Sequence, residues 1–242
     1  MTYSIVARCP RTGQYGVAVS TYSPVVGSNV PLVVSGRVAL AYQCVASPPM
    51  RALAGKLLAE GMSGEEVFAQ FAADDPHWQS RQLIAVDSKG ASAGFTGSRA
   101  PVHAGHKLGD GFACAGNVLT PTCLDDTFRE FSATQGSDLS LSERLVRALE
   151  AGARSNGQEE GLMSAALLVH GSEPFPLEDL RVDVHDTPVK ELRRVWEFMQ
   201  PLEAYYVQRK TDPSGLPRWW QKRMEMVPGW KPNHLVKVVP QQ

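Results

Sequence analysis

The sequence predicts an α+β fold in which two mostly antiparallel sheets are sandwiched between layers of helices. Short segments rich in β-formers come in pairs joined by turn residues, and segments with helical periodicity also come in pairs. Strands therefore do not alternate singly with helices, which argues against a parallel sheet built from βαβ units. The sequence also lacks the phosphate-binding patterns GxGxxG and GxxxxGKS/T.

The first predicted strand covers residues 2–8. Its side chains alternate between two faces, with Thr2, Ser4 and Val6 on the same face. A turn containing Pro and Gly leads to a second strand at 15–21, so the two strands form a β-hairpin. We expect the rest of the fold to be organised around the first strand.

The remaining elements follow in chain order. Runs of β-formers predict further strands at 32–34, 37–43, 81–87, 91–97, 111–117, 163–169 and 179–184. Helical periodicity predicts helices at 50–59, 63–73, 122–132, 139–153 and 189–200. Ser63 with Glu66 three residues later is a capping box for the second of these helices. The loop at 23–31 contains two prolines and could wall one side of a pocket.

The pattern changes after residue 200. Aromatic residues gather there among Pro, Lys and Arg without clear periodicity, namely Tyr205, Tyr206, Trp219, Trp220 and Trp230. We expect one domain over 1–200 and an aromatic-rich C-terminal extension over 201–242. Because aromatic anchors are enriched at protein interfaces, the extension predicts a homo-oligomer, most simply a dimer.

Charge and hydropathy limit the possible partners. The 242 residues include 24 Lys and Arg against 25 Asp and Glu, so no basic surface for nucleic acid and no polybasic membrane anchor is expected. The first thirty residues have no basic start followed by an apolar segment, and no stretch approaches the roughly 18 apolar residues of a membrane span. We expect a soluble, cytoplasmic protein.

The cysteines and histidines do not indicate a metal or other cofactor. The four cysteines form no CxxC pair and have no histidine at zinc spacing, so we expect them to be reduced and at least two of them to be buried. They are Cys9, Cys44, Cys114 and Cys123. His103 and His106 could form an acid/base or metal pair, but a third ligand is missing from their spacing.

Thr2 is the first candidate catalytic residue. Removal of Met1 would place the threonine hydroxyl beside a free α-amino group, which is a nucleophile with its own base. We expect this hydroxyl to be solvent-facing at the start of its strand. The alternative is that the dipeptide has no chemical role, as in most proteins that begin Met-Thr.

Several segments together make the chain resemble a bacterial family known as domain of unknown function 1028, placed in the N-terminal nucleophile (Ntn) hydrolase superfamily. The similarity covers roughly residues 2–200. The matching segments are 2–8, 16–19, 81–83, 95–97, 104–106, 116–117 and the helix start at 189–194.

The resemblance implies a four-layer αββα sandwich with Thr2 as nucleophile. It also implies hydrolysis of a linear or cyclic amide bond in a small molecule. One departure concerns the charge network of proteasome-like subunits, which have an Asp near the end of the second strand and a Lys at the start of the third. This chain has Thr21, Tyr22 and Arg37 there, so the resemblance does not extend to that charge network.

Further candidates surround this nucleophile. Asn117 could donate its side-chain amide to a developing oxyanion, or Gly116-Asn117 could simply make a left-handed turn. Gln43 could contact the substrate or be a satisfied buried amide. The other candidate substrate-binding residues are Arg81 and Arg99, which could grip a carboxylate or pair at the surface, with Thr96 and His106. Ser20, Thr21 and Thr96 could instead orient the amine or be ordinary β-formers. A non-catalytic binding protein or a scaffold on the same fold stays open as an alternative.

Overall fold

The computed structural model describes residues 2–155 and 161–226. These residues belong to two units, Met1–Gln200 and Pro201–Gln242. The first unit is an α+β fold whose two sheets are antiparallel throughout the described strands.

The larger sheet has the strand order β10-β9-β2-β1-β8-β7. Its strands are β1 (Thr2–Arg8), β2 (Tyr15–Thr21), β7 (Gly105–Gly109), β8 (Phe112–Asn117), β9 (Ser164–His170) and β10 (Pro176–Val182). The smaller sheet has the order β3-β4-β5-β6. Its strands are β3 (Pro31–Val34), β4 (Val38–Cys44), β5 (Arg81–Val86) and β6 (Ser92–Thr96).

Strand β1 lies inside the larger sheet, with β2 on one side and β8 on the other. Alternation along β1 sends Tyr3, Ile5 and Ala7 into an apolar cluster with helical residues, whereas Val6 joins a cluster that includes residues of both sheets. β1 is thus buried on both faces, in agreement with its predicted central role.

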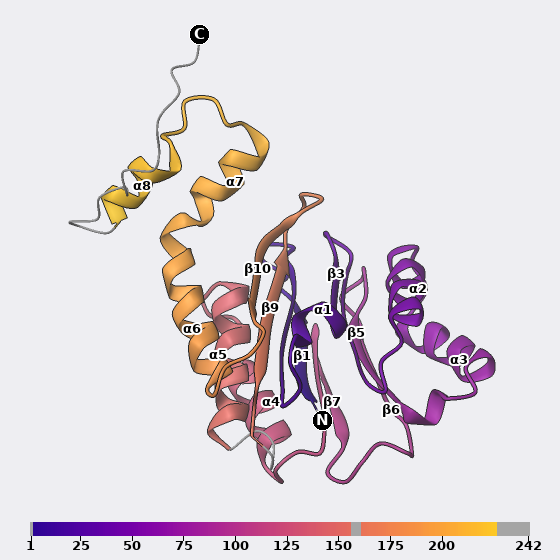
Figure 1. Ribbon diagram of the computed structural model, residues 1–242. Coiled ribbons are helices and arrows are strands. Elements are labelled where there is room, and N and C mark those ends of the chain that lie inside the picture. The colour runs from indigo at the N-terminus through magenta and orange to yellow at the C-terminus, as the bar shows by residue number, and fades with distance from the viewer. Residues whose placement is uncertain (1, 156–160, 227–242) are drawn as a thin grey trace. The chain divides into compact units, whose positions relative to one another are not determined.

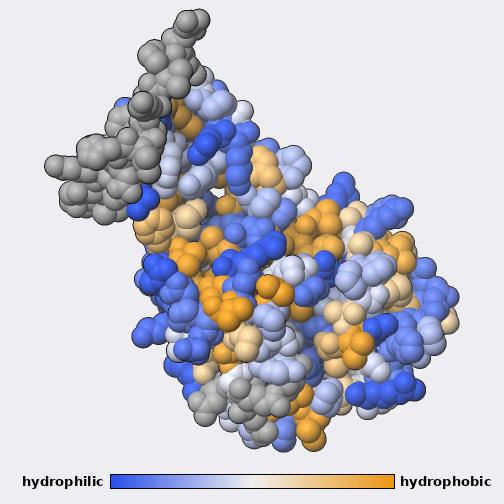
Figure 2. All heavy atoms as spheres, viewed as in Figure 1, coloured by the Kyte–Doolittle hydropathy of each residue, from blue (hydrophilic) through white to orange (hydrophobic). Residues whose placement is uncertain are grey.

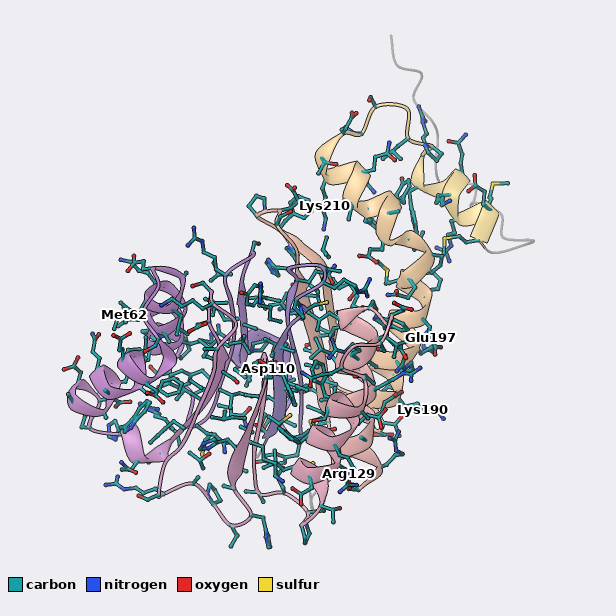
Figure 3. All side chains as sticks on the ribbon, turned by 180° about the vertical axis from the view of Figure 1, so that it is seen from behind. Met62, Asp110, Arg129, Lys190, Glu197 and Lys210 are labelled. Atoms are coloured by element: carbon teal, nitrogen blue, oxygen red, sulfur yellow. The ribbon has the colours of Figure 1, made fainter. Side chains whose placement is uncertain are left out.

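Helices cover the larger sheet on the side of Tyr3 and Ile5. They are α4 (Cys123–Ala133), α5 (Leu141–Arg154) and α6 (Pro188–Met199). In Figure 3 the labelled Arg129 and Lys190 point outward from α4 and α6, away from the sheet. The helices are therefore amphipathic, with their apolar faces on the sheet.

The smaller sheet carries α2 (Pro48–Ala59) and α3 (Gly64–Asp74), which form an apolar cluster with β4 and β5. Hydrophilic residues predominate along the outer edge of these two helices (Figure 2). A one-turn helix α1 (Val26–Asn29) and a 3-10 turn at Trp78–Ser80 complete the connections in this part of the chain. The two sheets lie next to each other, with α2 and α3 on one side and α4, α5 and α6 on the other (Figure 1).

Most predicted elements are found, with three informative differences. The capping box of Ser63 and Glu66 is confirmed, because each side chain bonds the other residue's backbone N–H. Strand β7 was not predicted, β10 begins three residues earlier than expected, and the loop after β2 contains α1. Cys9, Cys114 and Cys123 are buried, as expected for at least two of the cysteines.

The second unit contains the end of a 3-10 turn (Gln200–Leu202), α7 (Glu203–Thr211) and α8 (Trp219–Met226). Within it the rings of Tyr205, Tyr206 and Trp219 contact one another, and Tyr205 Oη donates to Pro217 O at 3.1 Å. Trp230 of the predicted aromatic extension lies outside the described residues. Across the described chain, every helix is too short or too polar to cross a membrane.

Candidate functional site

Thr2 is held between two neighbouring strands at one end of the larger sheet. In the sheet register it is paired with Thr21 of β2 on one side and with Asn117 of β8 on the other. Asn117, more than a hundred positions away in the sequence, therefore becomes a direct neighbour of Thr2.

The layer between the two sheets changes from apolar to polar at this end. Farther along the same strands and on the same face, the side chains form an apolar cluster that includes Val6, Val19, Ile84 and Ala115. Two residues closer to the Thr2 end of each strand, on the same face, hydroxyl and amide side chains take the place of these apolar ones. The buried members of this polar cluster are Thr2, Ser4, Thr21, Gln43, Gln82 and Asn117.

The Thr2 hydroxyl is directed at its neighbour on β2. Its Oγ1 donates to Thr21 Oγ1 at 3.2 Å, and Thr2 is 7% exposed in the chain that includes Met1. The expectation of a solvent-facing hydroxyl is therefore wrong, because the inter-sheet face of β1 is covered by the second sheet even at its first residues.

A chain of amides connects the two sheets beside Thr2. Ser4 Oγ donates to Gln43 Oε1 in a short contact, and Gln43 Nε2 donates to Gln82 Oε1 at 2.8 Å. Asn117 Nδ2 donates to the same Gln82 oxygen at 2.9 Å. Gln43 is thus a buried amide with partners on both sides, as its structural alternative predicted.

Gln82 is the centre of this chain, and it is not among the residues that the sequence singles out as functional. Its Nε2 lies within hydrogen-bond distance of Thr96 Oγ1 (3.0 Å), Gly105 O (3.1 Å) and Gly116 O (2.8 Å). Two amide hydrogens are shared among these acceptors. A signal was present in the sequence, because Gln82 alternates in phase with the core residue Ile84 and so had to face the interior.

Asn117 is an extended residue of β8, so the left-handed turn suggested for Gly116-Asn117 is wrong. The positive φ falls instead on the next residue, Val118, at 54°. A β-branched residue in this region is a genuine backbone outlier, with a cost of order 1–3 kcal/mol.

Such outliers gather at the Thr2 end of the sheets. Four non-glycine residues in the described chain have positive φ, and they are Val25, Cys44, His103 and Val118. Cys44 directly follows Gln43, and Val118 directly follows Asn117. The loops of His103 and Val118 are joined by backbone bonds, including Val118 N to Val102 O at 3.1 Å. Strained residues of this kind persist where the surrounding structure holds them, often at functional sites.

A cavity of about 540 Å³ lies beside the polar cluster, lined by the segment from Thr96 to His106. Thr96 Oγ1 and His106 Nδ1 are 2.9 Å apart, and Thr96 also accepts from Gln82. Burial lowers the pKa of His106, which favours its neutral form. The cavity is thus connected to the amide chain through Thr96.

The two candidate arginines are not part of the cluster. Arg81 points to the opposite face of β5, where its Nε donates to Asp75 Oδ2 at 2.8 Å in a buried ion pair. The bond to Arg81 is the main cause of a lowered pKa of the Asp75 carboxyl. Arg99 is exposed in the loop that leads to His103, and its backbone N–H donates to Gln79 O.

No charged side chain replaces the proteasome-like network within the described cluster. Arg37 lies at the other end of β4 from Gln43, and its guanidinium donates to Ala59 O at 3.1 Å. Thr21 occupies the end of the second strand with a neutral hydroxyl. Among the described residues, no group of three potential metal ligands is present either.

Comparison with known proteins places the chain in a family. The model of a family of unknown function, DUF1028, matches residues 2–192. The chain belongs to the DUF1028 family. A crystal structure of a DUF1028 protein from Silicibacter pomeroyi is 30% identical, with a TM-score of 0.73 over 82% of this chain and 88% of that one. The residues matched by the family model, 2–192, include every member of the polar cluster.

More distant similarities contribute nothing further. Anbu (ancestral beta-subunit) from Yersinia bercovieri is 11% identical, with a TM-score of 0.41 over 85% of this chain and 97% of that one. Anbu from Hyphomicrobium sp. is 11% identical with a TM-score of 0.40. Similarity at this level supports no functional argument, and no curated protein matches the chain.

The chemistry available in this DUF1028 site is that of neutral groups. Hydroxyls of Thr2 and Thr21 can attack or relay a proton, and amides of Asn117 and Gln82 can donate to a developing negative charge. None of the buried members of the described cluster has a titratable side chain that could accept the proton of Thr2.

Proposed function

We propose that this protein is an N-terminal nucleophile amidohydrolase, with Thr2 as nucleophile after Met1 is removed. The two sheets with helices on their outer sides are, in this proposal, the four-layer αββα sandwich of the Ntn hydrolases. The observation that supports it most is the position of Thr2, at the polar end of the inter-sheet layer and in register with both Thr21 and Asn117.

In the proposed reaction, Thr2 Oγ1 attacks the carbonyl carbon of an amide and its proton passes to the α-amine. The amine suits this role because an α-amino pKa of about 7.7 to 8.0 leaves part of it neutral near pH 7. Collapse of the tetrahedral intermediate breaks the C–N bond, and the leaving nitrogen takes the proton. An ester on Thr2 remains, which water hydrolyses to regenerate the hydroxyl.

Asn117 is the proposed donor to the oxyanion. It is the neighbour of Thr2 in the sheet, and its Nδ2 is held by the bond to Gln82 Oε1. An amide nitrogen has two hydrogens, so this bond orients the group while using one of them. Preorganised donors of this kind stabilise a transition state because they need not reorient during the reaction.

The substrate is proposed to be a small molecule with a linear or cyclic amide. The cavity beside Thr96 and His106 is of the size that small ligands occupy, and it adjoins the amide chain that ends at Asn117. Arg99, in the exposed loop of this cavity, is the remaining candidate for a substrate carboxylate. Gln43 and Arg81 are not proposed as substrate ligands, because both are already engaged by protein groups.

A screen of linear and cyclic amides tests this proposal. The mature protein should release product from at least one member, whereas Thr2→Ala should not. The alternative, a binding protein or scaffold on the same fold, predicts ligand binding without turnover and equal affinity in the two proteins.

A further inference from the structure

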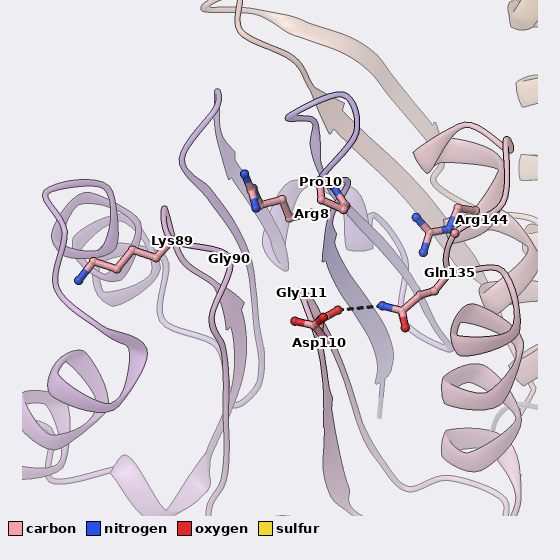
Figure 4. Close-up of a pocket in the computed structure, with 9 residues that line it drawn as sticks. Arg8, Pro10, Lys89, Gly90, Asp110, Gly111, Gln135 and Arg144 are labelled. Atoms are coloured by element: carbon pink, nitrogen blue, oxygen red, sulfur yellow. Dashed lines mark hydrogen bonds between the residues drawn. The ribbon is translucent and has the colours of Figure 1, made fainter.

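A second cavity lies at the opposite end of β1, about 20 Å from Thr2 along the strand. Its volume is about 330 Å³, and the side chains around it include Arg8, Arg144 and Asp110 (Figure 4). Arg8 is the last residue of β1, and Arg144 is in the first turns of α5. The proposed hydrolase chemistry uses none of these residues.

Arg144 is a buried cation without an acidic partner. It is 5% exposed, and it forms no ion pair with any described residue. Its Nε donates to Thr134 Oγ1 at 3.2 Å, and its guanidinium carbon lies 4.3 Å from the centre of the Phe131 ring. These contacts orient the guanidinium, but neither neutralises its charge.

The rest of the guanidinium is available to the cavity. The terminal nitrogens of Arg144 make no hydrogen bond to the described residues, and the side chain extends from α5 toward the space below Arg8 and Pro10 in Figure 4. Burial lowers the pKa of Arg144; the nearby thiol of Cys9 acts in the opposite direction, and the charge of Arg11 acts in the same direction as burial. A buried charge in this position is costly unless a counter-ion occupies the site.

Arg8 is a second cation that lines the cavity, and its side chain extends toward Gly90 in Figure 4. Its Nε is buried without a hydrogen-bond partner in the described chain, and its guanidinium packs over Gly90 and the ring of Tyr15. A Cβ on Gly90 would lie 3.0 Å from an Arg8 terminal nitrogen, so glycine there leaves room for the guanidinium.

The other charged residues that line the cavity do not neutralise the positive charges of Arg8 and Arg144. Asp110 is the acidic residue that lines the cavity, and it is exposed to solvent. Its backbone carbonyl, rather than its carboxylate, accepts from Gln135 Nε2 at 2.8 Å. Lys89 also lines the cavity, although its side chain points away from it in Figure 4.

We infer that this cavity binds a small anion bearing a phosphate or carboxylate group, with Arg144 and Arg8 as its cationic side chains. Arginine forks match both groups, because parallel N–H donors meet two oxygens of the anion. The ligand neutralises the buried charge of Arg144 and links β1 to α5. The site is separate from Thr2, so anion binding does not depend on the proposed hydrolysis.

Thermal unfolding and calorimetric titration with inorganic phosphate and with malonate test this inference, with chloride at equal ionic strength as the blank. Wild-type protein should bind at least one of the two anions saturably, and the stronger one identifies the group. Arg144→Met and Arg8→Met should each weaken binding about ten- to a hundredfold, the value of a hydrogen bond to a charged group. Arg129→Met, which removes an exposed arginine of α4 outside the cavity, should bind like wild type.

Two results would overturn the inference. One is a wild-type protein that responds to neither anion beyond the chloride blank. The other is unchanged affinity in Arg8→Met and Arg144→Met. If Arg144→Met does not fold, Arg8→Met with Arg144→Lys decides the matter, since lysine keeps the charge but loses the fork. Thr2→Ala should bind the anion as wild type does, which separates this site from the one at Thr2.

Discussion

Asn117 Nδ2 donates to Gln82 Oε1 at 2.9 Å, so the residue next to Thr2 in one sheet is held by a residue of the other sheet. Gln43 donates to the same oxygen at 2.8 Å. The orientation of the proposed oxyanion donor therefore depends on how the two sheets are packed.

Replacement of Gln82 tests this dependence. Gln82→Glu keeps an acceptor for Asn117 and Gln43 but cannot donate to Gly116 O when ionised, so it places a buried charge against a carbonyl. We expect kcat to fall more than tenfold with little change in KM, because repulsion between the carboxylate and Gly116 O should displace the side chain of residue 82 and, with it, the Asn117 amide that it orients. Gln70→Glu, at an exposed position of α3 away from the polar cluster, is the control and should retain wild-type kinetics. An unchanged kcat in Gln82→Glu would show that Gln82 is not needed to orient Asn117.

Asn117→Ala should lower turnover about a hundredfold or more while the protein remains folded. The expected size follows from removal of one oxyanion donor, which costs about 3 to 4 kcal/mol in other enzymes. Steady-state kinetics on any amide from the screen provide the measurement, with circular dichroism to establish folding. An unchanged rate would reduce Asn117 to a structural residue.

The pH dependence of kcat/KM should identify the base. The α-amine must be neutral to accept a proton, so the rate should rise with pH along a limb near pKa 7.7 to 8.0. Burial lowers the pKa of His106, so its titration falls below this limb. His106→Gln should leave the limb in place. Its disappearance in that variant would make His106 the base instead.

The ion pair of Asp75 and Arg81 should stabilise the fold rather than bind substrate. The pKa of Asp75 is lowered, so its contribution is present above its unfolded pKa of about 3.9 and is lost as the pH falls through the folded value. Asp75→Asn leaves Arg81 buried and unpaired, which should cost about 3 to 5 kcal/mol at pH 7. Urea unfolding from pH 7 to pH 2 should show the difference from wild type shrinking toward low pH. Asp125→Asn, which breaks a half-exposed pair with Lys107, should cost less than about 1 kcal/mol.

Sedimentation velocity tests the proposed homodimer. The described aromatic residues Tyr205, Tyr206 and Trp219 contact one another within the second unit, so part of their apolar surface is already covered. We still expect a dimer for the full chain and a monomer after truncation at residue 200. A monomeric full chain at working concentrations would exclude the dimer.

The fold was predictable where the pattern is strong and local. The hairpin of β1 and β2 and the capping box at Ser63 follow from alternation and spacing. Strand β7 was not predictable in this way. Its sequence from Gly105 to Gly109 has two glycines and few β-formers, so this segment becomes a strand only by pairing with β8.

The site was only partly predictable, for a related reason. Thr2 and Asn117 stood out by chemistry, but their adjacency depends on the register of β1 with β8, which local pattern does not specify. Arg81 looked like a substrate ligand because sequence cannot show Asp75 folding back onto it. The role of Gln82 follows from contacts with the other sheet, although its phase with Ile84 already indicates a polar residue in the core.

Covalent capture at Thr2 tests the central claim most directly. A β-lactone probe should be opened by the Thr2 hydroxyl to give an ester that adds the full probe mass, located by peptide mapping to the N-terminal peptide of a chain lacking Met1. Thr2→Ser should be labelled, whereas Thr2→Ala and a chain with an extra N-terminal residue that cannot be excised should not. Labelling that persists in Thr2→Ala, or full turnover by a chain that retains Met1, would contradict the assignment and place the nucleophile elsewhere.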